Sequence, residues 1–132
     1  MGRATDFPIK TRMLTRRHET WVLVILRTLA GGQTRLWLQR RPARGIWAGL
    51  YCTPVYESES QAQALWPDAR WQTLATVSHS LTHRELRLIP LLADLPPDAQ
   101  PGDGQWMDME GLDAIGMPAP VRSLLLALPG RD

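Results

Sequence analysis

Apolar and polar residues follow one another in the first half of the chain in a way that predicts a β-hairpin. Residues 20–29 (TWVLVILRTL) are apolar and β-branched, Gly31 and Gly32 interrupt them, and residues 34–39 (TRLWLQ) alternate polar with apolar side chains. Runs of this length on either side of a glycine turn are typical of two antiparallel strands. We therefore expect a strand, a tight turn and a second strand.

The next segment predicts a loop, a third strand and a short helix. Residues 41–45 (RPARG) have the composition of a turn. Residues 46–55 (IWAGLYCTPV) are typical of a strand whose small residues allow another backbone to come close. Either Ser58 or Ser60 can cap a short helix that runs through Trp66.

The pattern returns to strands after this helix. Residues 71–79 (WQTLATVSH) and 85–93 (ELRLIPLLA) predict two strands, and the loop SLTHR between them predicts a hairpin. The polar, proline-rich and glycine-rich segment 94–104 (DLPPDAQPGDG) is expected to be a surface loop.

The last part of the chain carries helix signals that agree with one another. Pro118 and Pro120 stand at its start, Gly130 follows it, and apolar residues recur with helical spacing at Val121, Leu124, Leu125 and Leu128. The order of elements predicts an α+β fold, in which a mixed β-sheet is sandwiched by a short helix and a C-terminal amphipathic helix.

Length and composition favour one domain. The chain has 132 residues, of which 44% are hydrophobic, enough for a single core. Residues 1–18 show no apolar period and are expected to be a connector, which leaves residues 19–132 as the domain. The longest apolar stretch, residues 21–26, is far shorter than the ~20 residues that cross a bilayer, and we expect a cytoplasmic protein. The single cysteine, Cys52, forms no internal disulfide and cannot supply the thiolates of a zinc or iron–sulfur site.

The positive charge is carried mainly by arginines in the first third of the chain, although the formal net charge is only +2. A guanidinium suits phosphate because it donates two parallel hydrogen bonds, but arginines that only solvate the surface give the same composition. Trp37 and Trp47 flank the arginine-rich turn, where they would stack on bases or, as tryptophans more often do, pack in the core. The arginines are Arg12, Arg16, Arg17, Arg27, Arg35, Arg40, Arg41 and Arg44.

Few residues are spaced for catalysis. His79 and His83 have an HxxxH spacing, but in an extended chain they would stand about 13 Å apart, too far to share a metal ion unless a turn at Leu81 and Thr82 brings them closer. The serines beside them lack the G-x-S-x-G frame of a nucleophile. Glu57 and Glu59 would form either a magnesium site or helix-start charges that the helix dipole favours. We expect a binding protein with no catalytic and no metal-ligating residue.

Three segments resemble the C-terminal domain of MutY-type A/G-specific adenine DNA glycosylases. Residues 41–51 (RPARGIWAGLY) resemble the RPxxGLWGGLW/F segment of that family. Residues 79–83 (HSLTH) resemble its HTFSH loop, and residues 119–125 (APVRSLL) its terminal APVxxLL helix. The matches occur in family order and extend over roughly residues 20–128.

The resemblance implies a Nudix-like fold, related to the enzyme that hydrolyses 8-oxo-dGTP. Nudix hydrolases hold magnesium through the signature G-x5-E-x7-R-E-x2-E-E-x-G. Counting from Gly49 places Val55 at the first glutamate, and counting from Glu57 places Leu65 and Trp66 at the Arg-Glu pair. Because these carboxylates are missing, we expect no site for magnesium-assisted diphosphate cleavage.

The resemblance also implies which loop reads DNA. In the family the HTFSH loop contacts 8-oxoguanine, so that only adenine mispaired with the lesion is flipped out and excised. By position, Thr82 takes the role of the serine that bonds to the lesion, Leu81 replaces the phenylalanine that packs near it, and His83 keeps the histidine. His79 and Ser80 complete the expected lesion-binding loop. The candidates for contact with the DNA backbone are Arg41, Arg44 and Arg84.

The function implied is a non-catalytic, 8-oxoguanine-recognising domain of an adenine DNA glycosylase in base excision repair. Its partners would be duplex DNA with 8-oxoguanine opposite adenine and an N-terminal glycosylase domain of the same protein. That catalytic domain would hold an iron–sulfur cluster, and this part would hold no cofactor. We expect a monomer, associated with the nucleoid of a bacterium. The alternatives are a divergent Nudix hydrolase acting on a nucleoside diphosphate derivative and a protein-interaction module that uses exposed tryptophans.

Overall fold

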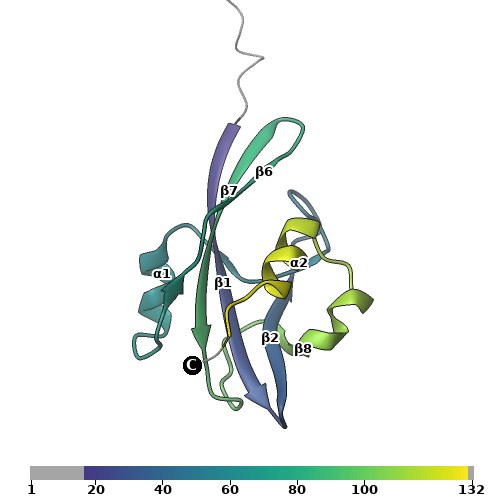
Figure 1. The fold of residues 1–132 in the computed structure, drawn as a ribbon. Helices are drawn as coiled ribbons and strands as arrows, with labels where there is room; N and C mark the ends of the chain where they lie inside the picture. Colours follow the sequence, from purple (N-terminus) through teal and green to yellow (C-terminus); the bar gives the residue numbers. More distant parts are fainter. Residues whose placement is uncertain (1–16, 131–132) are drawn as a thin grey trace, which may run out of the picture.

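Two long parallel strands, β1 (Arg17–Ala30) and β7 (Arg84–Asp94), form the centre of one mixed sheet (Figure 1). The structure, a computed structural model, describes residues 17–130. The strand order is β3-β2-β1-β7-β5, while β4, β6 and β8 pair with β1, β7 and β2. These other pairings are antiparallel. The remaining strands are β2 (Gln33–Arg40), β3 (Tyr51–Cys52), β4 (Val55–Tyr56), β5 (Gln72–Thr73), β6 (Val77–Ser80) and β8 (Gln105–Asp108).

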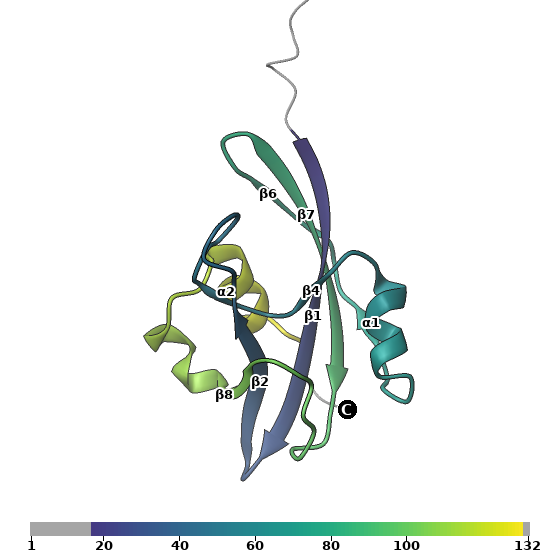
Figure 2. The same ribbon diagram turned by 180° about the vertical axis from the view of Figure 1, so that it is seen from behind.

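Helices cover both faces of the sheet. Figures 1 and 2 show α1 (Glu59–Leu65) on one side, and α2 (Ala119–Leu126) with the 3-10 helix η2 (Met109–Ala114) on the other. Leu23 of β1 belongs to the same buried cluster as Leu125 of α2, and its neighbour Val24 to the cluster that holds Ala62 of α1. A strand covered on both faces buries consecutive residues, which explains the unbroken apolar run in β1. The predicted α+β sandwich with a mixed sheet is confirmed.

The capped helix before the middle of the chain forms as predicted. Ser58, and not Ser60, is the N-cap of α1: its hydroxyl accepts a hydrogen bond from the Gln61 N–H. The Gln61 side chain accepts in turn from the Ser58 N–H, which completes a capping box. The helix ends at Leu65, one residue before the predicted end at Trp66.

The third strand predicted over residues 46–55 is wrong for most of its length. Residues 46–49 form a turn, and only the two-residue strands β3 and β4 follow. Gly45, Trp47 and Gly49 all have positive φ angles, which no extended strand allows. The small residues that suggested a close strand therefore serve a loop.

The hairpin predicted from residues 71–79 and 85–93 is confirmed in its second half. Residues 77–80 form β6 and pair with β7, but residues 74–76 interrupt the first strand and leave β5 as a separate pair of residues. A run that looks continuous in sequence therefore forms two separate strands, each paired with β7.

Two elements that the sequence pattern does not predict, β8 and η2, follow the proline-rich surface loop. β8 pairs with β2, and Trp106 of β8 packs edge-on against Trp37 with ring centres 5.2 Å apart. The chain can come this close because Gly104 has no side chain: a Cβ there would lie 2.5 Å from the Leu38 carbonyl oxygen. η2 follows at once and buries Leu112.

Both ends of the predicted domain differ slightly from expectation. Arg17 and His18, assigned to the connector, open β1, whereas the rest of that connector lies outside the described residues. α2 begins at Ala119, after Pro118, and ends at Leu126, so Leu128 packs against the core from beyond the helix. Among residues 17–130, no helix is long and apolar enough to cross a membrane.

Candidate nucleic-acid interface

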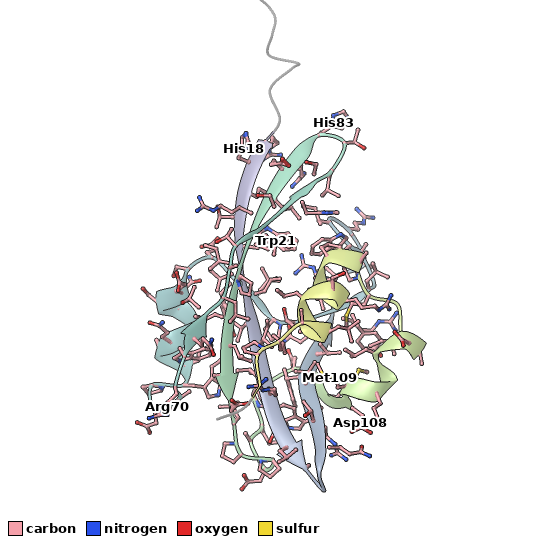
Figure 3. All side chains as sticks on the ribbon, viewed as in Figure 1. His18, Trp21, Arg70, His83, Asp108 and Met109 are labelled. Atoms are coloured by element: carbon pink, nitrogen blue, oxygen red, sulfur yellow. The ribbon has the colours of Figure 1, made fainter. Side chains whose placement is uncertain are left out.

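A hairpin finger, made of β6, the first part of β7 and the first part of β1, projects from one end of the molecule. Figure 3 shows His18 and His83 together at its end. β1 and β7 pair from Arg17 and Arg84 onward, and the Arg17 N–H donates to the His83 carbonyl oxygen at 3.2 Å. The finger is therefore a continuous three-stranded part of the sheet, and backbone hydrogen bonds extend to its tip.

The tip of the finger is a two-residue turn. The Leu81 N–H donates to the Arg84 carbonyl oxygen at 2.8 Å, which leaves Thr82 and His83 as the turn residues. Both are exposed, and in the described part of the chain neither side chain makes a hydrogen bond. The Thr82 hydroxyl and the His83 imidazole are thus available to a ligand.

Two of the predicted contact residues already have partners. The Ser80 hydroxyl donates to both carboxylate oxygens of Glu85, at 2.9 Å to Oε1. Arg84 forms an ion pair with Glu19 of β1. Ser80 and Arg84 connect neighbouring strands of the finger, and DNA would have to compete with a carboxylate for each of them.

The remaining predicted residues lie on the face of the finger that looks toward the body of the molecule. His79 is one residue away from Ser80 and so projects to the opposite face of β6. Its ring lies 5.8 Å from that of Trp47, and Leu81 is half-buried against the core. The five residues 79–83 therefore do not form one patch: the tip carries Thr82 and His83, while the inner face carries His79 and Leu81.

The loop of residues 41–50, hereafter the arginine loop, lies beneath this inner face. In Figures 1 and 2 it stands at the same end of the molecule as the finger. The Gly49 N–H donates to Pro42 O at 2.9 Å, and Arg40 at the end of β2 donates to the Gly49 carbonyl oxygen at 3.0 Å. These bonds close the loop at its base and assign Arg40 a structural role.

The two arginines within the arginine loop have no acidic partner among the described residues. Arg41 lies over Trp21, with its guanidinium carbon 4.7 Å from the ring centre, and Arg44 is exposed. Within residues 17–130, neither forms an ion pair. Both predicted backbone-contact residues of the loop are therefore free to meet a phosphate.

The tryptophans divide between core and interface. Trp37 is 3% exposed, and its indole N–H donates to Asp103 O at 3.0 Å, so it belongs to the core. Trp47 is half-buried and meets Trp21 edge-on, with ring centres 5.5 Å apart. Sequence reasoning missed Trp21, because a tryptophan in a buried strand gives no sign that it supports a loop.

A cavity of about 400 Å³ lies on the other side of β1, beside α1. Its lining includes the carboxylates of Glu19 and Glu57, and no Lys or Arg. Like charges repel, so the cavity is a poor site for a diphosphate. Its lining residues are Glu19, Thr20, Trp21, Val55, Tyr56, Glu57 and Gln61.

The residues of α1 do not fit a magnesium ion. Glu59 is the single acidic residue of the helix, and one of its carboxylate oxygens accepts from the Thr73 hydroxyl at 3.0 Å. In the described part of the chain, no three His, Cys, Asp or Glu residues lie close enough to share an ion. Carboxylate clusters are what magnesium-assisted phosphate chemistry requires, and these residues do not supply one.

The lone cysteine lies below the arginine loop in the core. Burial raises the pKa of the Cys52 thiol to about 11, and the bonds to Thr53 and the charge of Arg41 offset this only in part. A thiol with such a pKa is protonated at neutral pH and is a poor nucleophile. Cys52 therefore adds no chemistry to the interface.

The chain is similar to known proteins in sequence and in fold. An adenine DNA glycosylase of Buchnera aphidicola subsp. Schizaphis graminum is 22% identical in an alignment of 130 residues that covers 90% of this chain. The chain spans only 36% of that relative's length.

Solved structures share the fold. The C-terminal domain of mouse MUTYH, solved with human PCNA, is 19% identical and superposes with a TM-score of 0.66 over 88% of this chain and 95% of that one. The NUDIX domain of Shewanella oneidensis NrtR, solved with ADP ribose, is 15% identical and has a TM-score of 0.66 over 89% and 90%. A family model described as the NUDIX domain matches residues 22–127, most of the chain. The chain belongs to the NUDIX domain family.

Proposed function

We propose that this chain is the DNA-reading part of a MutY-type adenine DNA glycosylase, which recognises 8-oxoguanine opposite adenine and does not itself cleave a bond. The observation that carries the proposal is the turn of Thr82 and His83, exposed at the tip of a hydrogen-bonded, three-stranded finger. The match to an adenine DNA glycosylase over 90% of the chain supports it. The excision chemistry and an iron–sulfur cluster would belong to a catalytic domain in the remainder of the parent protein.

The chemistry of the tip suits the lesion. Guanine has an acceptor at N7, whereas 8-oxoguanine carries an N–H there and a carbonyl oxygen at C8. The Thr82 hydroxyl can accept from the first through a lone pair and donate its proton to the second. Leu81 is half-buried and brings no aromatic ring to the base. We therefore expect a moderate preference for the lesion.

The duplex would be held mainly by charge. Arg41 and Arg44 lack acidic partners in the structure described, so neither must break an ion pair before it meets a phosphate. Arg84 is paired with Glu19, which neutralises much of its charge, and would add less. Binding by so few cations is weak and falls with salt. We further propose a monomeric, nucleoid-associated protein with no resident cofactor in this part.

Hydrolysis of a nucleoside diphosphate derivative is the less favoured function. The cavity beside α1 is lined by Glu19 and Glu57 and by no Lys or Arg, and Arg84, the cation paired with Glu19, lies outside the lining. The helix α1 offers Glu59 alone. Neither arrangement holds a diphosphate with its metal ions. Phosphate release from a panel of nucleotides with magnesium would contradict the proposed function.

The test is the affinity of the chain for three duplexes that differ at one base pair, with adenine opposite 8-oxoguanine, adenine opposite guanine, and cytosine opposite guanine. Thr82→Val keeps the side-chain shape and removes the hydroxyl. We expect it to lower affinity for the lesion duplex by about threefold to tenfold, the value of one hydrogen bond, and to leave the undamaged duplexes unchanged.

The matched control is Thr76→Val, an equally exposed threonine before β6. It should alter none of the three affinities. Equal losses on all three duplexes for Thr82→Val would contradict lesion reading by the tip. Release of adenine by the chain alone would contradict its non-catalytic role.

A further inference from the structure

Arg41 is a cation without a counter-charge in the described residues. Its Nε is buried and has no hydrogen-bond partner, and its guanidinium lies against Trp21. The Nε of Arg122 is also buried without a partner, but the Nη2 of Arg122 donates to two carbonyl oxygens. Arg27 and Arg35 pair with carboxylates, and Arg40 bonds to a carbonyl oxygen. A buried donor without an acceptor is costly and uncommon. Arg41 differs from these arginines because no nitrogen of its guanidinium has an acceptor among the described residues.

The backbone next to Arg41 offers further donors. Within the arginine loop, hydrogen bonds use the N–H groups of Arg41, Gly49 and Leu50, while those of residues 43–48 have no acceptor in the part of the chain described. The φ angles are positive at Gly45 (94°), Trp47 (58°) and Gly49 (73°), and negative at the two residues between them. In proteins, alternation between right-handed and left-handed backbone conformations can turn successive N–H groups to the same side, which is the geometry of anion-binding nests.

The loop is held in this shape at some cost. Trp47 is the one non-glycine residue with a positive φ among residues 17–130, a conformation that costs on the order of 1 kcal/mol or more. Contacts with Trp21 and His79 hold it there. A Cβ added at Gly45 or Gly49 would meet no atom within 4 Å, so these glycines serve the backbone conformation and not packing.

We propose that the Arg41 guanidinium and the backbone N–H groups of residues 45–48 bind a phosphate oxyanion. The source of the phosphate rests on the proposed function: the ligand is one phosphodiester of the DNA backbone, beside the base that the finger tip contacts. The planar guanidinium, fixed on Trp21, would give two of the bonds, and the loop would supply the others. The site fixes position on the duplex and carries no base preference.

The first arm of the test uses inorganic phosphate and needs no DNA. Titration should shift the NMR signals of the Arg41 Nε–H and of the Gly45 and Trp47 amides together, with one saturation curve. Arg41→Lys keeps the charge but lacks the planar guanidinium, and we expect it to lower the affinity for phosphate at least about fivefold. Arg35→Met removes one charge at the far end of the molecule, near Asp108 (Figure 3), and should change nothing.

The second arm uses the lesion and undamaged duplexes. Each of Arg41→Lys and Arg41→Met should lower the affinity for the lesion duplex and for the undamaged duplex by the same factor, about threefold to tenfold. Arg41→Met should also reduce the slope of log affinity against log salt concentration by about one. Preference for the lesion should stay unchanged. The amide spectrum of each variant shows whether the loop and the core remain folded.

The outcomes separate the inference from the proposed function. Phosphate shifts at the loop without any binding of duplex would uphold the anion site and overturn the proposed function. Lesion-selective binding in which both Arg41 variants match Arg35→Met, with no phosphate shifts at the loop, would overturn the anion site alone. Loss of lesion preference in Arg41→Lys would also contradict it, because the site should not read bases.

Discussion

Cys52 shows at the scale of one residue how the core alters a side chain. The thiol is fully buried, and its pKa rises from an ordinary value of 9.0 to about 11. A pKa raised by folding means that the protonated form is favoured in the folded state. The stabilisation is complete below about pH 9 and is lost as the pH rises toward 11.

We predict that Cys52 makes the protein lose stability in alkali. At about pH 10.5 the free energy of unfolding should fall by about 2 kcal/mol through this group, relative to about pH 8. Urea unfolding at both pH values, for the natural chain and for Cys52→Ala, measures the effect. The variant should be less stable at the lower pH but lose less on going to the higher. Parallel losses in the two proteins would show that the thiol is not responsible.

The sequence predicts which residues of the finger are candidates for DNA contact, but not which of them already have partners. Thr82 and His83 are exposed at the tip, as a motif read from sequence can suggest. Ser80 is taken up by Glu85, and Arg84 by Glu19, because strand register brings those carboxylates opposite them. Register depends on the whole sheet and cannot be read from five consecutive letters.

Among the elements, α1 tests most simply whether local signals decide structure. The side chains of Ser58 and Gln61 form a reciprocal capping box, while Ser60 is exposed two residues after the cap, in the first turn of the helix. We predict that Ser58→Ala lowers the free energy of unfolding by about 1 kcal/mol. Ser60→Ala, which removes the same atom, should change it by less than about 0.5 kcal/mol. Chemical denaturation of both variants gives the comparison, and equal effects would rule out the cap.

The sequence predicts an element correctly where one face is buried or where the signal is local, as a helix cap is. It fails where the conformation of the backbone determines the structure. The amphipathic pattern of α2 and the cap of α1 are local, and both were found. Residues 46–49 have strand-like composition, yet Gly45, Trp47 and Gly49 adopt positive φ and make a turn. β8 is too short to show a period, and it is fixed only by its contact with β2.

On the scale of the whole molecule, one arginine connects the two central strands to the segment that follows α2. Arg27 of β1 is 6% exposed. It donates to Asp94 of β7 at 2.6 and 3.1 Å and to the Pro129 carbonyl oxygen at 2.6 Å. The charge is buried on the arginine side and half-exposed on the aspartate side.

We predict that Asp94→Ala costs about 2 to 3 kcal/mol of stability, because it leaves the buried guanidinium without its carboxylate. Asp108→Ala breaks the exposed pair with Arg35, whose side chains are 44% and 45% exposed, and should cost at most about 0.5 kcal/mol. Thermal unfolding of the two variants is the measurement. A cost for Asp108→Ala that equals or exceeds that of Asp94→Ala would contradict this assignment.

The central claim is that the finger tip reads the lesion. The most direct measurement is the difference between two NMR titrations of the chain, one with the 8-oxoguanine–adenine duplex and one with the same duplex carrying guanine. We predict that the amides of Thr82 and His83 shift differently in the two titrations, while those of the arginine loop shift alike. Differences centred on Glu57 and Tyr56 beside α1, or none anywhere, would contradict the claim.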